Sequence, residues 1–268
     1  MLAEFWRRWR RCQQTRAERG REVPDLLWQR VLLTYPFLAG RSDDDLRLLR
    51  QRTGQFLARK EFTGVDGLVV TDDMAVAIAA QACLPILHLG LQAYDGFVGI
   101  VVHPDEVLAR RSEMDEDGVV HEYDEPLTGE AMAGGPVMLA WADVAAAGES
   151  AVVGYNVVIH EFTHVLDMQD GWADGVPGLP DAQARKHWAD VLDHEWQTLC
   201  DRLDAGEPVA IDDYGAEGPE EFFAVTSEAF FVAPGLLHDE HPAMYQLLAS
   251  YFRQDPLSWP PSRPPLAA

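Results

Sequence analysis

The stretch of sequence that decides the fold is Ala151-Val-Val-Gly-Tyr-Asn-Val-Val-Ile-His160-Glu161-Phe-Thr-His164-Val-Leu-Asp167. Most of its residues up to Leu166 are apolar, so we expect a buried helix over residues 151–168. A buried helix needs a partner for every polar side chain that it carries into the interior. Its histidines and carboxylates are therefore the first candidates for a functional site.

The spacing of His160, Glu161 and His164 predicts a metal site. Because the two histidines are four residues apart, both imidazoles project from one face of a helix and can bind one metal ion. Zinc, the metal typical of this motif, lowers the pKa of a bound water molecule toward about 7, and Glu161 can act on that water as a general base. The alternative is two core histidines that bond to carbonyl oxygens, which requires both partners on the same helical face.

A third protein ligand must complete such a site. In the pattern His-Glu-x-x-His-x-x-Gly-x-x-His the last position would be Asp170, but Asp167 replaces the glycine that provides the sharp turn. We expect a better ligand in Gly218-Pro-Glu-Glu-Phe-Phe-Ala-Val-Thr-Ser-Glu-Ala-Phe-Phe231, where proline suits the first position of a helix and apolar residues surround it.

Two glutamates of that second helix point the same way. Glu221 and Glu228 are seven residues apart, and carboxylates on a buried helix need a cation or a donor. At 1.5 Å per residue they lie about 10 Å apart, too far to bind one ion together. We therefore expect Glu221 to be the third metal ligand and Glu228 to accept a bond from an imidazole N–H, with Asp167 as the competitor for that role. The alternative is that both glutamates face solvent at the helix edge.

Along the whole chain, the pattern predicts helices first, then the strands of a small mixed sheet, and then helices again. This order indicates an α+β fold. Acidic, glycine-containing residues 112–130 predict a mobile hairpin or loop. We expect strand 136–141 to offer an edge to an extended peptide. The predicted strands are 67–70, 97–102 and 136–141, and the other predicted helices are 3–20, 25–38, 42–60, 73–82, 181–203, 219–232 and 241–252. The predicted division is a helical segment 1–64 packed on the core, a catalytic domain 65–257 and a proline-rich tail 258–268.

Charge and cysteine content limit the class of protein. The chain has 268 residues, a net charge of -23, 47% hydrophobic residues and three cysteines. Such acidity argues against a protein that binds nucleic acid directly, because phosphates must be neutralised by lysine and arginine. Sparse cysteines, no secretory leader and no apolar run of membrane-spanning length predict a cytoplasmic protein without a membrane span. Residues 1–60 are basic, which suggests either an internal counterweight to the acidic remainder or an arm that docks a partner.

The motifs resemble those of the Mlc titration factor A family, bacterial zinc metallopeptidases whose catalytic region is similar to that of anthrax lethal factor. The similarity runs nearly from end to end and is carried by His160–Met168, Asp174–Pro177, Tyr214, Glu221–Phe231, Gly135–Trp141 and Tyr251–Pro256. The resemblance implies a zincin fold of the gluzincin type, one Zn²⁺ held by His160, His164 and Glu221, Glu161 as the catalytic residue, and Tyr214 near the substrate oxyanion.

Two functions follow from the resemblance as expectations. The first is a zinc-dependent peptidase with aminopeptidase activity, in which the Tyr214 hydroxyl donates to a tetrahedral oxyanion. By its residue type alone, Tyr214 would more often be a packing residue, and only its position before Glu221 makes the two roles equal alternatives. The second is a regulator that binds and sequesters a transcription repressor of the Mlc type, with little or no enzymatic activity. Glu161 favours the peptidase, because a pure binding protein has no need for a carboxylate beside its metal ligands.

Overall fold

The computed structural model describes residues 22–114 and 120–259, with only the backbone described over 107–114 and 120–127. A mixed sheet has the strand order β1-β2-β6-β5. Strands β1, β2 and β6 are parallel, and β5 runs antiparallel to β6, which confirms the predicted α+β class. The strand bounds are β1 Glu61–Gly64, β2 Gly99–His103, β5 Gly129–Ala131 and β6 Val137–Ala140.

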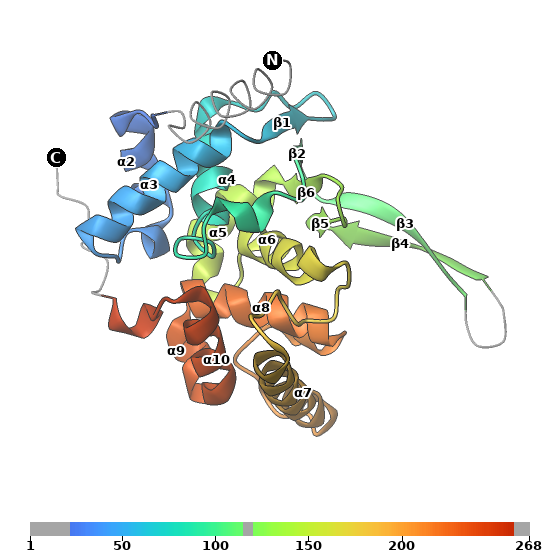
Figure 1. The fold of residues 1–268 in the computed structure, drawn as a ribbon. Helices are drawn as coiled ribbons and strands as arrows, with labels where there is room; N and C mark the ends of the chain where they lie inside the picture. The colour runs from blue at the N-terminus through green and yellow to red at the C-terminus, as the bar shows by residue number, and fades with distance from the viewer. Residues whose placement is uncertain (1–21, 115–119, 260–268) are drawn as a thin grey trace, which may run out of the picture.

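Helix α6 lies between the sheet and helix α8, and helices α4 and α5 pack against α6 (Figure 1). Helices α2, α3 and α4 pack together on the N-terminal side, whereas α7 to α10 form the C-terminal side. The bounds are α2 Asp25–Thr34, α3 Asp43–Leu57, α4 Asp72–Ala82, α5 Trp141–Ser150, α6 Val157–Asp167, α7 Ala182–Asp204, α8 Pro219–Val232, α9 Pro234–Glu240 and α10 Pro242–Phe252.

One hydrophobic core joins the two sides, and helix α6 is its central element. The ring of Phe162, fully buried on α6, lies 5.0 Å from the Tyr94 ring and 5.7 Å from the Phe56 ring, centroid to centroid. The buried hydrophobic residues form one cluster, whose first member along the chain is Val23 and whose last is Phe252. The predicted segment boundaries at residues 64 and 257 stay predictions, and the predicted helix 3–20 and most of the tail 258–268 lie outside the described residues.

The predicted strand 67–70 is wrong. The chain forms β1 at Glu61–Gly64 and then turns at Asp66 and Gly67, whose φ angles are +52° and +85°. A Cβ on Gly64 would overlap the Leu68 carbonyl, so the apolar run after the turn folds back against the end of β1 instead of joining the sheet. An apolar run of four residues does not by itself distinguish a strand from such a packed, extended segment.

Other boundaries also differ from the predictions. Helix α6 begins at Val157 rather than at residue 151, because Gly154 has a φ of +89° and the Asn156 side chain caps the helix. The predicted helix 241–252 is preceded by the separate helix α9, and each of the two begins with a proline. Helix α5 was not predicted. The predicted hairpin or loop 112–130 overlaps an antiparallel hairpin formed by β3 (Val107–Met114) and β4 (Val120–Leu127).

Candidate metal centre

The N-terminus of α6 is held in place by Asn156. Its Oδ1 accepts a hydrogen bond from the Ile159 backbone N–H at 2.9 Å, and its Nδ2 donates to Gln81 Oε1 on α4 at 2.8 Å. All three side chains are buried, so both bonds are protected from water. The rotation of α6 about its axis is therefore fixed, and with it the direction in which its histidines point.

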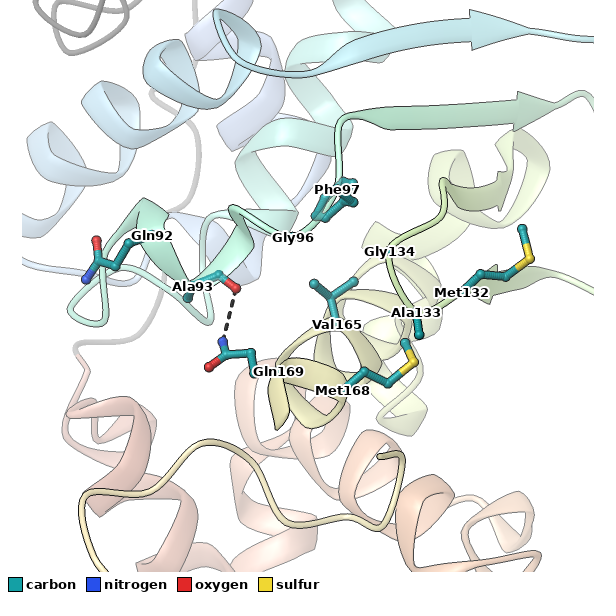
Figure 2. A pocket seen from close by; sticks show the side chains of 10 residues that line it. All are labelled: Gln92, Ala93, Gly96, Phe97, Met132, Ala133, Gly134, Val165, Met168 and Gln169. Atoms are coloured by element: carbon teal, nitrogen blue, oxygen red, sulfur yellow. Dashed lines mark hydrogen bonds between the residues drawn. The ribbon is translucent and has the colours of Figure 1, made fainter. Parts of the chain in front are cut away.

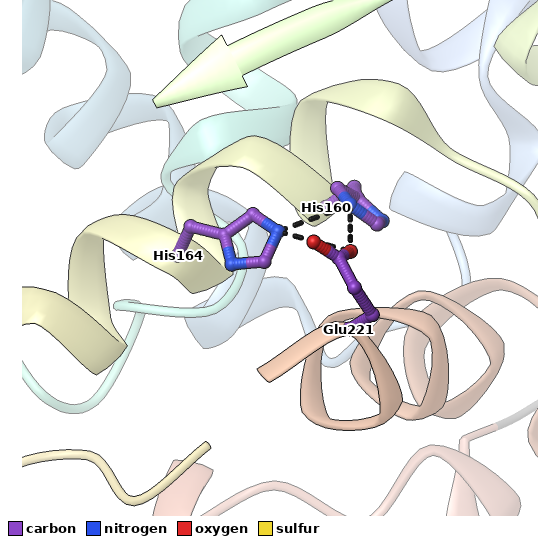
Figure 3. A group of neighbouring side chains, drawn as sticks. All are labelled: His160, His164 and Glu221. Carbon is purple, nitrogen blue, oxygen red and sulfur yellow. Dashed lines mark hydrogen bonds and ion pairs between the residues drawn. The ribbon is translucent and has the colours of Figure 1, made fainter. Parts of the chain in front are cut away.

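The structure brings His160, His164 and Glu221 together. The two imidazoles extend from α6, and the Glu221 carboxylate reaches them from the first turn of α8 (Figure 3). Glu221 Oε2 lies 3.1 Å from His160 Nε2 and 3.3 Å from His164 Nε2, and the two Nε2 atoms are 3.1 Å apart. All three potential ligand atoms lie within 4.8 Å of one another, so a single metal ion could bind to all of them.

The chemistry of these atoms fits a cation. Glu221 Oε2 is buried and makes no hydrogen bond within the described residues. His160 Nδ1 lies 2.7 Å from the Glu228 carboxylate and donates to it in the neutral ring, which leaves the lone pair of Nε2 facing Glu221. Two acceptors that point at each other need a positive charge between them. Two imidazole nitrogens and one carboxylate oxygen are a donor set that Zn²⁺ accepts in sites with an open fourth position.

The pKa values of the site also indicate an excess of negative charge. Burial alone would lower the pKa of His160, but the carboxylates of Glu228 and Glu221 outweigh burial and hold that pKa well above its usual value. Burial alone would raise the pKa of Glu221, yet its contacts with His160 and His164 lower it to about 2. The carboxylates therefore favour a cation at this position, whether a proton or a metal ion.

Glu228 lies behind His160, away from Glu221. Besides its contact with His160 Nδ1, its Oε2 accepts the backbone N–H of Asn156 at 2.5 Å. Burial raises the pKa of Glu228, and the neighbouring imidazole opposes that shift. A carboxylate in this position fixes the ring orientation of a histidine ligand and increases its basicity.

Glu161 is only 5% exposed, and its carboxylate borders strand β5. A Cβ at Gly129 would overlap this carboxylate, so the close approach of strand and side chain depends on a glycine at that position. Burial raises the pKa of Glu161 to about 7, against the opposing effect of the two histidines. A carboxyl group with this pKa can both accept and donate a proton near neutral pH.

Tyr214 lies beside His160 and lines the same cavities as His160 and Glu161. It belongs to the short helix η5 (Asp213–Ala216), whose first turn is capped by the Asp212 side chain. The Tyr214 ring centroid is 6.1 Å from that of His160, and 44% of the residue is exposed. The side chain is therefore accessible from the solvent side of the metal centre.

These residues surround a cavity of about 280 Å³, which we call the metal-site pocket. A second cavity of about 250 Å³ shares His160, Glu161 and Tyr214 with it. The metal-site pocket is lined by Gly129, Glu130, Ala131, His160, Glu161, His164, Met168, Ala173, Tyr214, Glu220 and Glu221. Among the residues that the structure describes, this lining contains four glutamates and neither lysine nor arginine.

Asp167 and Asp170 lie apart from the three clustered side chains. Asp167 Oδ2 accepts the backbone N–H of Gly175 at 2.9 Å, while its Oδ1 is buried without a hydrogen bond among the described residues. Burial raises the pKa of Asp167 to about 6, although the Gly175 N–H opposes the shift. Asp170 forms an ion pair with Arg185 at 2.8 Å on the surface. Glu228, rather than Asp167, is thus the carboxylate in contact with His160.

The sequence alone did not identify the strand that borders this site. The predicted strand 136–141 is present as β6, but the expectation that it offers a free edge is wrong, because β6 lies between β2 and β5. Within the described residues, the free edge next to Glu161 belongs to β5, which has only three residues. Its only sequence signal is Gly129, and one glycine in an acidic loop does not distinguish an edge strand from a turn.

No helix within residues 22–114 and 120–259 combines the length and the apolar character needed to cross a membrane.

Comparison with known proteins identifies the family. The chain is 38% identical over 232 residues to an uncharacterized protein of Synechocystis sp., a match covering 86% of this chain and 84% of the relative. It is 37% identical over 236 residues to Mlc titration factor A of Serratia proteamaculans, covering 86% and 88% of the two chains. For Mlc titration factor A of Yersinia pestis the identity is 34% over 229 residues, covering 84% of each chain. These matches confirm the resemblance inferred from the motifs.

Residues 6–253, and thus both helices of the metal centre, match the family described as glucose-regulated metallo-peptidase M90. Together with the relatives, this match shows that the chain belongs to the M90 family of metallopeptidases.

Proposed function

We propose that the protein is a zinc-dependent peptidase of the cytoplasm with aminopeptidase activity, and that His160, His164 and Glu221 are its zinc ligands. The observation that carries the proposal is the convergence of three acceptor atoms within 4.8 Å, with the buried carboxylate of Glu161 beside them. The M90 family membership supports metallopeptidase chemistry. A zinc ion at this position supplies a water molecule of lowered pKa and polarises a peptide carbonyl.

Four other side chains have separate roles in the proposed mechanism. Glu161 accepts a proton at its carboxylate as the nucleophile forms and passes it to the departing amine, and its pKa of about 7 suits both steps. The Tyr214 hydroxyl donates a hydrogen bond to the oxyanion of the tetrahedral intermediate. Glu228 holds the His160 ring in place through the 2.7 Å contact at Nδ1, and Asp167 contributes a negative charge near His164.

The charge of the metal-site pocket supports the aminopeptidase activity. Glu130 and Glu220 add two carboxylates to its wall beyond those assigned to the metal and to proton transfer. Because the described part of the lining holds neither lysine nor arginine, the pocket attracts a cationic group such as the free α-amino group of a peptide. A peptide with a free N-terminus is therefore the proposed substrate.

Replacing the general base should stop catalysis without releasing the metal. We expect Glu161→Gln to lower kcat by at least about 100-fold, because an amide cannot accept the proton. Zinc content, measured by atomic emission on the purified protein, should stay at one ion per chain. The matched control is Glu217→Gln, which changes an exposed glutamate outside both cavities. Undiminished hydrolysis by Glu161→Gln would refute the mechanism.

The third metal ligand can be identified by metal content. We expect wild-type protein to bind about one zinc ion, and Glu221→Ala to lose most of it, because only two histidine ligands remain. Asp170→Ala, which removes the competing candidate, should keep its zinc, since Asp170 is paired with Arg185 on the surface. Metal analysis after dialysis compares the two variants, and circular dichroism verifies their folding. Full zinc occupancy in Glu221→Ala together with loss in Asp170→Ala would reverse the assignment.

The role of Tyr214 is testable through its hydroxyl group. We expect Tyr214→Phe to lower kcat by roughly 100-fold to 1,000-fold with little change in KM, because the lost donor acts on the transition state. Tyr251→Phe is the matched control, since Tyr251 packs against Trp188 and Phe223 outside both cavities. Steady-state kinetics on an alanine peptide separates the two parameters. A rise in KM alone would make Tyr214 a binding residue.

We propose a second function, the binding of a repressor of the Mlc type, supported by relatives named Mlc titration factor A at 34–37% identity. If sequestration is separate from catalysis, an Mlc-type repressor should be retained equally by immobilised wild-type protein and by Glu161→Gln. Retention is measured by pull-down with the purified repressor, and albumin is the control. Absence of retention by both proteins would limit the function to peptide hydrolysis.

A further inference from the structure

An uncharged cavity of about 320 Å³ lies at the C-terminal end of α6, and we call it the methionine pocket. Met132 and Met168 line it together with Phe97 and Val165 (Figure 2). Gly96 and Gln169 belong to its rim, where both are exposed. The Gln169 Nε2 donates to the Ala93 carbonyl at 3.0 Å, which ties the end of α6 to the chain that precedes β2.

The methionine pocket lies next to the metal-site pocket. Met168 lines both cavities and follows His164 by four residues, so it lies about 6 Å farther along the same helical direction. On the opposite wall, Ala131 at the end of β5 lines the metal-site pocket, and the next residue, Met132, lines the methionine pocket. The two cavities are therefore neighbours, with Met168 as a wall that they share.

The chemistry of the two cavities differs sharply. The described lining of the methionine pocket contains no ionisable side chain, whereas that of the metal-site pocket contains four glutamates. Met132 is 44% exposed, which is costly for a large apolar side chain unless it meets an apolar partner. Methionine side chains are flexible and polarisable, so they adapt to apolar groups of different shapes.

The size and position of the pocket suit one side chain of a peptide. Its volume is at the lower end of the range for ligand pockets, about 300–1,000 Å³. The free edge of β5 can pair with an extended peptide, whose residues advance about 3.3 Å each, so that the 6 Å between His164 and Met168 correspond to about two residues. Alternate side chains of that peptide would point toward α6.

We propose that the methionine pocket binds a large apolar side chain, such as leucine, methionine or phenylalanine, of a substrate residue within three positions of the scissile bond. This inference rests on the proposed peptidase function and adds the substrate class that the enzyme prefers. The acidic metal-site pocket then selects for a positive charge, and the methionine pocket selects separately for apolar surface.

The test is a set of alanine peptides with free N-termini in which one leucine is moved through the positions around the cleaved bond. Cleavage sites are determined by mass spectrometry. For the wild-type protein, leucine at one position should raise kcat/KM by at least about 10-fold over alanine, while aspartate or lysine there should not raise it. Equal rates for all peptides would overturn the proposal.

Two variants fill the pocket, and one matched variant does not. A Cβ on Gly96 meets nothing within 4 Å, so Gly96→Leu adds a side chain at the rim without a clash, and Ala133→Leu fills the pocket from the other wall. Both should abolish the leucine preference, so that within each variant kcat/KM for the leucine peptide falls to the value for the all-alanine peptide. Gly235→Leu adds the same group at an equally open glycine on α9 and should keep the preference. A preference that persists in both filled variants would overturn the proposal.

A binding measurement separates failure of this inference from failure of the proposed function. If no peptide is cleaved, the peptidase proposal fails, and titration calorimetry of the leucine and alanine peptides into Glu161→Gln then judges the pocket. The leucine peptide should bind at least about 10-fold more tightly, and Gly96→Leu in the same background should remove the difference. Equal dissociation constants, or a change of oligomeric state in Gly96→Leu, would assign the pocket to another occupant.

Discussion

The rest of the structure depends on negative charge buried between α6 and α8. Glu161, Glu221 and Glu228 share this space with two imidazoles, and an unpaired carboxylate there would cost several kcal/mol. The histidines offset the charge only in part, as the raised pKa of His160 indicates. A bound cation would complete the balance, and so the centre that catalyses hydrolysis in the proposed mechanism would also stabilise the contact between the two helices.

Holding these charges in register requires rigid helices, and the surrounding residues provide that rigidity. Helix α8 is buried on nearly every side by its phenylalanines, so Glu221 enters the site from a backbone that has little freedom to move. On α6, Phe162 anchors the side opposite the metal centre in the aromatic cluster with Tyr94 and Phe97. Distances near 3 Å between the candidate ligands thus follow from packing far from the ligands themselves.

Local patterns predicted the helices of the site well, because the relevant information is local. The four-residue spacing of His160 and His164 fixes their common face, and the seven-residue spacing of Glu221 and Glu228 requires a polar partner for each. Strand positions depend instead on pairing between distant residues: β1 is defined by its register with Gly99 to Val102, and the apolar run 67–70 has no such partner. The edge strand β5 is too short to have an alternating pattern, so only the folded chain reveals it.

The contrast between the two pockets gives the charge distribution of the chain a physical meaning. In the proposed function, Glu130 and Glu220 attract a peptide amine over a distance set by ionic strength, whereas apolar contact with Met132 and Met168 would act only after the peptide has arrived. The first effect changes with salt, and the second depends on buried area. Because the two proposed effects act on different atoms of a peptide, they would combine independently: the acidic pocket would favour a free N-terminus, and the methionine pocket would discriminate among the peptides that have one.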